Sequence, residues 1–200
     1  MKRRVGQKFW KARPVPYAMR EKIDAELIRL ERRGVIEKVP RDFAEFAAPI
    51  VPVLKRSGAV RICGDFKISI NPYLEVDQYP IPRIEELFTK LEGGEKFTKL
   101  DLAEAYFQLE MDEGSINLVV INTHKGLYRF ARMPFGISPA PAIFQRTMDC
   151  ILQGLSGVVG YFDDVLVTGR NDDEHFRNLE ALFAKFQEMS QEMQVLATID

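Results

Sequence analysis

The segment Phe97–Leu102 alternates apolar and polar side chains with a period of two, which is the period of a β-strand. Leu100 and Leu102 fall on one face of the predicted strand, and Asp101 falls on the other. Solubility is a poor explanation for an acidic residue placed between two core leucines. Asp101 is therefore a candidate functional residue on a strand.

A second β-prone pattern surrounds a pair of acidic residues. The apolar runs Val158–Val159 and Val165–Val167 flank Asp163 and Asp164. Because neighbouring side chains on a straight strand point to opposite faces, adjacent carboxylates serve one site only where the chain turns. We predict a tight hairpin with both Asp residues at its tip. An ordinary Asp-containing turn explains this segment equally well when it is taken alone.

Helical spacing of apolar residues, bounded by start and stop signals, marks four other segments. These predict helices at about residues 16–33, 82–92, 138–152 and 172–186. In the last of them the apolar face is expected to consist of Phe176, Leu179, Phe183 and Phe186. That assignment leaves His175 at the surface.

A basic hairpin is predicted nearer the amino end. Pro49–Leu54 and Val60–Cys63 are strand-like and are joined by a flexible, basic turn. Lys55 and Arg61 are the cations of interest in this hairpin, and taken alone they fit a solvated basic turn.

Composition and charge narrow the class of protein. The 200 residues are 46% hydrophobic, which is globular, and carry a net charge of −1, so any nucleic-acid binding must depend on local patches. One such patch is the basic lead-in 1–15, predicted to be flexible: a solvated segment, or a phosphate-binding or nuclear-import arm. Two cysteines without ligand spacing predict free thiols. No apolar run is long enough to span a membrane and no secretory signal is visible, which predicts an intracellular protein without membrane contact.

Three carboxylates on neighbouring strands suit a hard cation such as Mg²⁺. Two such ions, about 4 Å apart, can hold both the attacking and the leaving oxygen in a phosphoryl transfer. Asp101, Asp163 and Asp164 are thus the candidate metal ligands.

Seven motifs occur in an order that resembles the reverse transcriptase of gypsy-like long-terminal-repeat retrotransposons, from about Lys11 to about Phe186. They are Ala48–Lys55, Val60–Phe66, Asp77–Pro82, Phe97–Leu102, Met133–Gly136, Pro141–Arg146 and Tyr161–Asp164. Phe135 follows the gypsy-like branch, whereas retroviral relatives usually have glutamine there. Val60 replaces the tryptophan common in the family, which affects local packing rather than chemistry.

The resemblance implies an α+β polymerase fold. Its palm, about residues 96–186, would be an antiparallel sheet with helices on one face. Its fingers would come from about residues 40–95, within a reverse transcriptase domain at 16–186 followed by a divergent tail at 187–200. The thumb, ribonuclease H and integrase parts of a parent polyprotein would lie elsewhere. A cytoplasmic particle or the nucleus would be the location.

The resemblance also implies a reaction and its residues. A primer 3′-oxygen attacks the α-phosphate of a deoxynucleoside triphosphate on an RNA or DNA template, with two Mg²⁺ ions, or Mn²⁺ in their place. Asp101, Asp163, Asp164 and the backbone carbonyl of Leu102 would hold the metal. Tyr106 would sit beneath the sugar and exclude a 2′-hydroxyl, although its spacing alone favours a core tyrosine. The implied nucleotide-binding residues are Lys55, Arg61, Ala105, Tyr106, Phe135 and Gly136.

Two alternatives to a reverse transcriptase enzyme remain open. The first is an inactive retrotransposon-derived remnant that at most binds nucleic acid. The divergent tail favours this remnant, whereas the intact Asp residues favour the enzyme. An RNA-dependent RNA polymerase with a related palm is disfavoured by Tyr106 and by Tyr161–Phe162 before the Asp pair.

Overall fold

The computed structural model describes residues 9–192, except 45 and 76–78, together with 196–197. The chain divides into two compact units that interleave along the sequence. The first comprises Met1–Val76, Tyr106–Ala140 and Leu196–Asp200, and the second comprises Asp77–Ala105 and Pro141–Val195. The segment expected as fingers, 40–95, thus contributes to both units.

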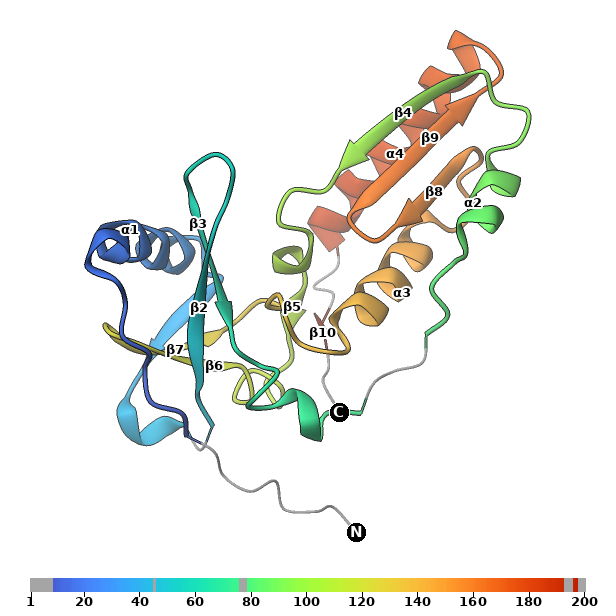
Figure 1. The fold of residues 1–200 in the computed structure, drawn as a ribbon. Coiled ribbons are helices and arrows are strands. Elements are labelled where there is room, and N and C mark those ends of the chain that lie inside the picture. The colour runs from blue at the N-terminus through green and yellow to red at the C-terminus, as the bar shows by residue number, and fades with distance from the viewer. Residues whose placement is uncertain (1–8, 45, 76–78, 193–195, 198–200) are drawn as a thin grey trace. The chain divides into compact units, whose positions relative to one another are not determined.

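The first unit is built on a five-stranded sheet with strand order β1-β7-β6-β2-β3 (Figure 1). β2 and β6 pair in parallel, and the other neighbours are antiparallel. A short parallel pair, β5 with β10, completes its strands. The elements are α1 (Tyr17–Arg32), β1 (Ile36–Val39), η1 (Arg41–Phe43), β2 (Ala48–Leu54), β3 (Val60–Gly64), η2 (Asn71–Tyr73), η3 (Ala105–Gln108, whose first residue belongs to the second unit), β5 (Glu110–Met111), β6 (Val120–Thr123), β7 (Gly126–Phe130) and β10 (Leu196–Ala197).

The core of the first unit joins α1 to the sheet. Ile23, Leu27 and Leu30 recur at helical spacing in α1 and are fully buried. Phe130 of β7 is also fully buried, and its ring packs edge-on against Phe66. α1 begins after Pro16 and is followed by Gly34 at φ +66°, so both of its predicted boundaries are confirmed.

Residues 9–15 pack against the first unit, which corrects the predicted flexible lead-in for this part. Phe9 forms a parallel bridge with Ala47, and Arg13 makes an ion pair with Asp65. Val15 is buried. Residues 1–8 lie outside the described part of the chain.

The second unit is a three-stranded antiparallel sheet with strand order β4-β9-β8 (Figure 1). α4 packs along β9 and β4, and the side chains that fill this face are Val165, Val167 and Leu182, all fully buried. The opposite face carries Val159, which packs on α2. The elements are α2 (Ile84–Lys90), β4 (Lys96–Asp101), α3 (Ala140–Leu152, from Pro141 onward in this unit), β8 (Val158–Tyr161), β9 (Asp164–Gly169) and α4 (Asp172–Glu192).

The buried face of α4 differs from the predicted one. Phe176 and Phe183 are 62% and 52% exposed, whereas Leu182 is fully buried. His175 was expected at the surface but is buried, with Nε2 2.8 Å from Oγ1 of Thr98 on β4. The physical reason is local: the backbone of α4 at His175 lies directly against Gly169, which turns this side of the helix toward the sheet.

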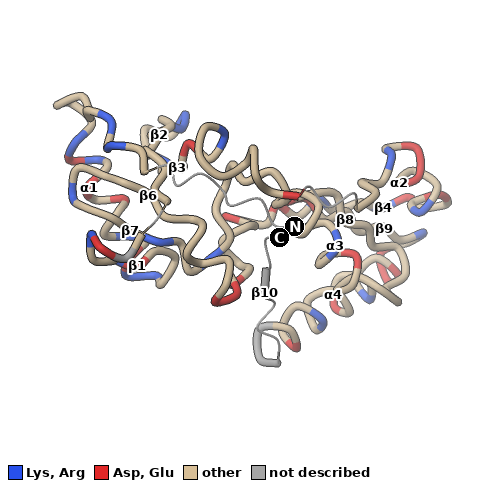
Figure 2. The backbone as a smooth tube through the Cα atoms, turned by 90° about the horizontal axis from the view of Figure 1, so that it is seen from below, with Lys and Arg blue, Asp and Glu red and all other residues tan. Residues whose placement is uncertain are grey.

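No helix in the described residues is both long enough and apolar enough to cross a membrane. Lys and Arg are interspersed with Asp and Glu along both units (Figure 2). This distribution agrees with the near-zero net charge.

Candidate active site

The acidic hairpin is present, with its tip one residue earlier than predicted. Tyr161 and Asp164 are the last paired residues of β8 and β9, so the two loop residues are Phe162 and Asp163. Phe162 has φ +52°, and a positive φ at the first loop residue is a feature of two-residue type II′ hairpins. Asp164 is therefore the first residue of a strand.

Asp101 lies directly opposite Asp164 in the β4–β9 ladder. Directly paired residues on antiparallel strands point to the same face, with Cβ atoms about 5 Å apart. The amide of Leu102 donates to the carbonyl of Asp163 at 2.8 Å, which ties the end of β4 to the hairpin tip. The sequence prediction that these three Asp residues belong to one end of one sheet is thus matched at the level of the backbone.

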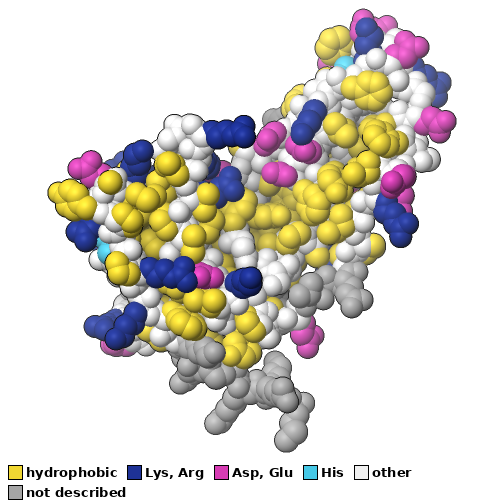
Figure 3. Space-filling model, viewed as in Figure 1, with side chains coloured by type: hydrophobic (Ala, Val, Ile, Leu, Met, Phe, Trp, Pro, Cys, Tyr) yellow, Lys and Arg dark blue, Asp and Glu magenta, His cyan; other side chains and the backbone are white. Residues whose placement is uncertain are grey.

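Lys99 supplies a positive charge beside these carboxylates. It lies on the same face as Asp101, two residues earlier in β4, and its Nζ is 2.7 Å from Oδ2 of Asp164. The hydrogen bond to Asp164, followed by the negative charges of Asp164, Asp101 and Asp163, raises the pKa of the Lys99 ammonium above its ordinary value. Lys99 is therefore a counter-charge that contacts Asp164 directly and lies in the negative field of Asp101 and Asp163. Figure 3 shows acidic side chains gathered beside a basic one and bordered by apolar side chains.

As they stand, the described side chains include no group of three His, Cys, Asp or Glu residues arranged to hold a metal ion. The convergence of all three carboxylates on a shared ion therefore stays a prediction. Their oxygen donors have the chemistry that Mg²⁺ prefers, and the Lys99 ammonium occupies a position where a cation is stabilised. Release of Asp164 from Lys99 would free this carboxylate for an ion.

Three of the candidate nucleotide-binding residues form a cluster in the first unit. The Arg61 guanidinium lies 4.6 Å from the centre of the Phe135 ring. Tyr106 packs on the same ring with centroids 5.0 Å apart, and Phe107 packs on it edge-on. The cluster thus places the Arg61 guanidinium on an aromatic face beside the half-buried Tyr106.

Asn71 holds the segment that contains Gly136. Its Nδ2 donates to the carbonyl of Gly136 at 2.8 Å, and its Oδ1 accepts from the amide of Ser138 at 3.0 Å. Gly136 is exposed at φ +96°, a conformation that favours glycine. The sequence carries only a weak signal for this role, an Asn-Pro dipeptide at Asn71, which is typical of loops.

Lys55 and Ala105 are the two remaining candidates for nucleotide binding. Lys55 begins the β2–β3 turn, where its amide donates to the carbonyl of Ala59. Ala105 is buried and is the last residue of its segment in the second unit.

Sequence analysis also gave Gln145 no role of its own. In the structure its fully buried side chain joins α3 to the acidic hairpin, because Oε1 accepts from the Phe162 amide at 2.9 Å. Its place in the Pro141–Arg146 motif was the only available signal.

Comparison with known proteins agrees with this architecture. A family described as "Reverse transcriptase (RNA-dependent DNA polymerase)" matches residues 55–195. The chain is 44% identical over 182 residues to "Uncharacterized protein K02A2.6" of Caenorhabditis elegans, and 31% identical over 181 residues to the "Retrovirus-related Pol polyprotein from transposon 412" of Drosophila melanogaster. These alignments cover 90% and 86% of this chain and 14% of each relative.

Solved structures give the same fold. A foamy viral protease–reverse transcriptase in complex with double-stranded DNA aligns over 92% of this chain and 32% of its own, with TM-score 0.83 and 20% identity. The same viral protein with an RNA/DNA hybrid aligns over 92% of this chain and 24% of its own, with TM-score 0.82 and 19% identity.

This chain belongs to the reverse transcriptase family. The resemblance based on seven motifs and the predicted α+β polymerase fold are both confirmed. The chain spans about one seventh of the length of the curated relatives described above.

Proposed function

We propose that this chain carries the nucleotidyl-transfer site of an RNA-directed DNA polymerase. The observation that carries the proposal is the cross-strand pair Asp101–Asp164 at the acidic hairpin, with Lys99 acting as a counter-cation, in a chain of the reverse transcriptase family. Paired carboxylates of this kind, next to a cation, are the oxygen donors that divalent ions need.

Asp101, Asp163 and Asp164 would hold two Mg²⁺ ions, with Mn²⁺ as a substitute, and the carbonyl of Leu102 would complete the donor set. When bound, such ions neutralise charge on the transferring phosphoryl group and lower the pKa of the attacking hydroxyl. The protein's own contribution is to hold the carboxylates at a fixed strand end, since positioning and charge neutralisation dominate phosphoryl transfer. No side-chain nucleophile is required.

The first-unit cluster would receive the deoxynucleoside triphosphate. Arg61 would contact phosphate oxygens, and Tyr106 and Phe135 would offer ring faces to the sugar and base. Lys55, Ala105 and Gly136 remain proposed contacts by family resemblance. The template and primer are proposed partners, because two of the similar viral structures contain nucleic-acid duplexes.

The proposal is tested by incorporation of a single nucleotide. Purified protein is mixed with an RNA template, a DNA primer, Mg²⁺ and one complementary deoxynucleotide at low salt, because backbone contacts to nucleic acid weaken steeply as salt rises. We expect template-dependent addition of one nucleotide, with little processive synthesis by the 200-residue chain alone. A second sample carries the following segment of the transposon 412 polyprotein fused to its end, and should extend the primer further. Failure of both samples supports the inactive-remnant hypothesis.

Replacing Tyr106 with Ala should increase use of ribonucleotides relative to deoxyribonucleotides. The ring that packs on Phe135 would be lost, and with it the surface that a 2′-hydroxyl would contact. The ratio of kcat/KM values for the two nucleotide types measures this effect. Tyr17→Ala is the control, because Tyr17 is 87% exposed in the same unit. Equal discrimination in both variants and wild type would remove Tyr106 from the site.

A further inference from the structure

Gln145 uses both ends of its amide to join α3 to the acidic hairpin. Its Nε2 donates to Oδ1 of Asp149 at 3.0 Å and to the carbonyl of Gly160 at 3.1 Å. Its Oε1 accepts from the amide of Phe162 at 2.9 Å. The side chain is fully buried, so these three bonds replace its contacts with water.

The orientation of the Gln145 amide is fixed by its partners. A carboxylate and a carbonyl can only accept, so they require the NH₂ end of Gln145 and leave the oxygen for Phe162. Asp149 is held in turn by Tyr79, whose hydroxyl donates to Oδ2 at 2.7 Å. The Arg146 guanidinium lies 5.3 Å from the centre of the Tyr79 ring. The result is a continuous chain of hydrogen bonds from Tyr79 to the hairpin tip.

Phe162, where this series of hydrogen bonds ends, has an unusual backbone conformation. Among the described residues other than glycine, only Glu104 and Phe162 have positive φ, both at 52°. Such a conformation is unfavourable for an L-residue and persists where the surroundings impose it. Phe162 comes directly before Asp163 and Asp164, so its φ sets the direction in which both carboxylates leave the hairpin.

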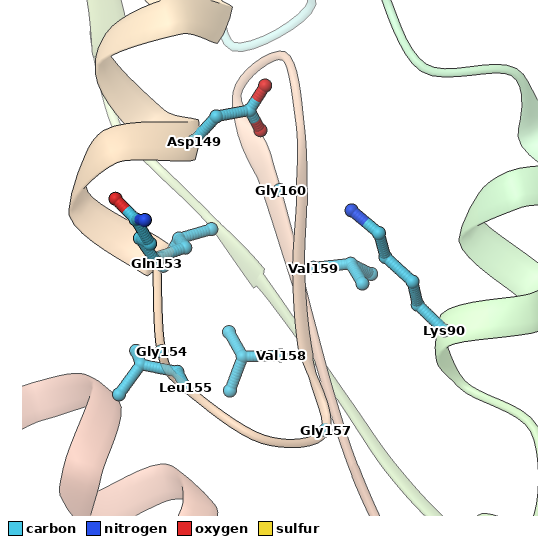
Figure 4. Close-up of a pocket in the computed structure, with 10 residues that line it drawn as sticks. Lys90, Asp149, Gln153, Gly154, Leu155, Gly157, Val158, Val159 and Gly160 are labelled. Atoms are coloured by element: carbon cyan, nitrogen blue, oxygen red, sulfur yellow. The ribbon is translucent and has the colours of Figure 1, made fainter.

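α3 lies close to β8, which brings Gln145 within hydrogen-bonding distance of Gly160 and Phe162. A Cβ added at Gly160 would come within 2.8 Å of Leu152 on α3. Beside the network, an open pocket of about 480 Å³ lies between α3, β8 and Lys90. Figure 4 shows Asp149 directed from α3 toward the strand near Gly160, with Lys90 extending from the other side.

We propose that Gln145 is a positioning residue for the acidic hairpin, with Tyr79 and Asp149 fixing the orientation of its amide. The Tyr79–Asp149–Gln145 chain holds Phe162 in its left-handed conformation and thereby presents Asp163 and Asp164 for metal binding. This hydrogen-bonded clamp, formed by Tyr79, Asp149 and Gln145 on the Phe162 amide, is inferred from the geometry alone. Its consequence for metal binding rests on the proposed function. The role of Gln145 is exerted through the hairpin rather than through contact with substrate.

Amide hydrogen exchange of the full chain tests the clamp directly. Gln145→Leu removes the acceptor of the Phe162 amide, so exchange at Phe162 should accelerate about tenfold, the net effect of one hydrogen bond. Exchange at Val165, in the centre of the sheet, should not change. Gln153→Leu, at an exposed position next to the end of the same helix, is the matched control and should change neither amide.

A paired substitution separates positioning from space filling. Gln145→Glu keeps the acceptor but places a second carboxylate against Asp149, so Phe162 should again lose protection. Adding Asp149→Asn supplies an NH₂ group that can donate to the new Glu, so protection should return in part, because the Gly160 carbonyl still lacks the donor that Gln145 gave it. Asp149→Asn alone should lower the pKa of Tyr79, which the hydrogen bond to Asp149 raises to about 12, toward its ordinary value. An ultraviolet titration of tyrosine ionisation measures that shift.

Mn²⁺-induced broadening of the Asp163 and Asp164 amides provides the functional readout, and Gln145→Leu should require several-fold more Mn²⁺ than wild type. Three results would overturn the clamp: unchanged exchange at Phe162 in Gln145→Leu, equal acceleration at Phe162 and Val165, or no recovery in the double variant. The exchange results decide on the clamp even if wild type binds no Mn²⁺, and absence of Mn²⁺ binding by wild type counts against the proposed function.

Discussion

Replacing Asp164 with Asn is expected to lower the rate of single-nucleotide incorporation by about 1,000-fold or more, and Asp101→Asn should have a similar effect. The two residues face each other across β4 and β9, so either substitution removes one side of the same proposed metal site. Loss of one preorganised group that stabilises transition-state charge costs about 100- to 1,000-fold, and loss of a metal ion costs more.

The Asp164→Asn variant should remain folded. The ion pair between Lys99 and Asp164 lies at the surface, and pairs that water can reach contribute little to the free energy of unfolding. Asp172→Asn is the matched control, since Asp172 pairs with Lys96 at the other end of β4. Incorporation by Asp172→Asn should stay close to wild type. A comparable loss in both variants would mean that charge near β4, rather than the acidic hairpin, controls activity.

Replacing Gly169 with Ala is expected to lower the free energy of unfolding by about 3 kcal/mol, the upper part of the usual range for overpacking. A Cβ at this position would lie 2.4 Å from the backbone nitrogen and 2.6 Å from the Cα of His175. Backbone atoms cannot rotate away as a side chain can, so α4 would have to move off β9. Leu182, which is fully buried, would lose part of its packing.

Gly160→Ala is the comparison for that experiment. The atom it would meet at 2.8 Å is the end of the Leu152 side chain, which can change rotamer. Chemical denaturation monitored by circular dichroism should therefore show a smaller loss for Gly160→Ala than for Gly169→Ala. The opposite order would contradict the packing of α4 on β9.

The sequence was sufficient to predict those secondary-structure elements whose pattern depends only on residues near one another along the chain. The alternation around Asp101 predicted a strand, and the run between Val158 and Val167 predicted a hairpin, because both depend on the period of two. The boundaries of α1 followed from local signals at Pro16 and Gly34. The predicted strand and hairpin contain the three Asp residues, so the residues of the candidate site could be predicted from the sequence.

Contacts between distant segments could not be predicted in this way. The buried face of α4 depends on His175 resting against Gly169, and apolar periodicity instead favoured Phe176 and Phe183. Gln145 and Asn71 act through backbone groups 15 or more positions away, which leave no mark on local composition. The exact tip of the hairpin was also missed, because the pairing of Tyr161 with Asp164 is set by the ladder and not by the Asp pair.

Whether Asp101, Asp163 and Asp164 form one divalent-ion site is tested most directly by a Mn²⁺ titration of isotope-labelled protein followed by NMR. Paramagnetic broadening reports which amides lie near the ion. We predict that the amides of Asp101, Leu102, Asp163 and Asp164 broaden first and together, and that this broadening is much weaker in Asp164→Asn. Broadening centred on other acidic residues, such as Glu85 and Glu86 of α2, with the hairpin unaffected, would contradict it.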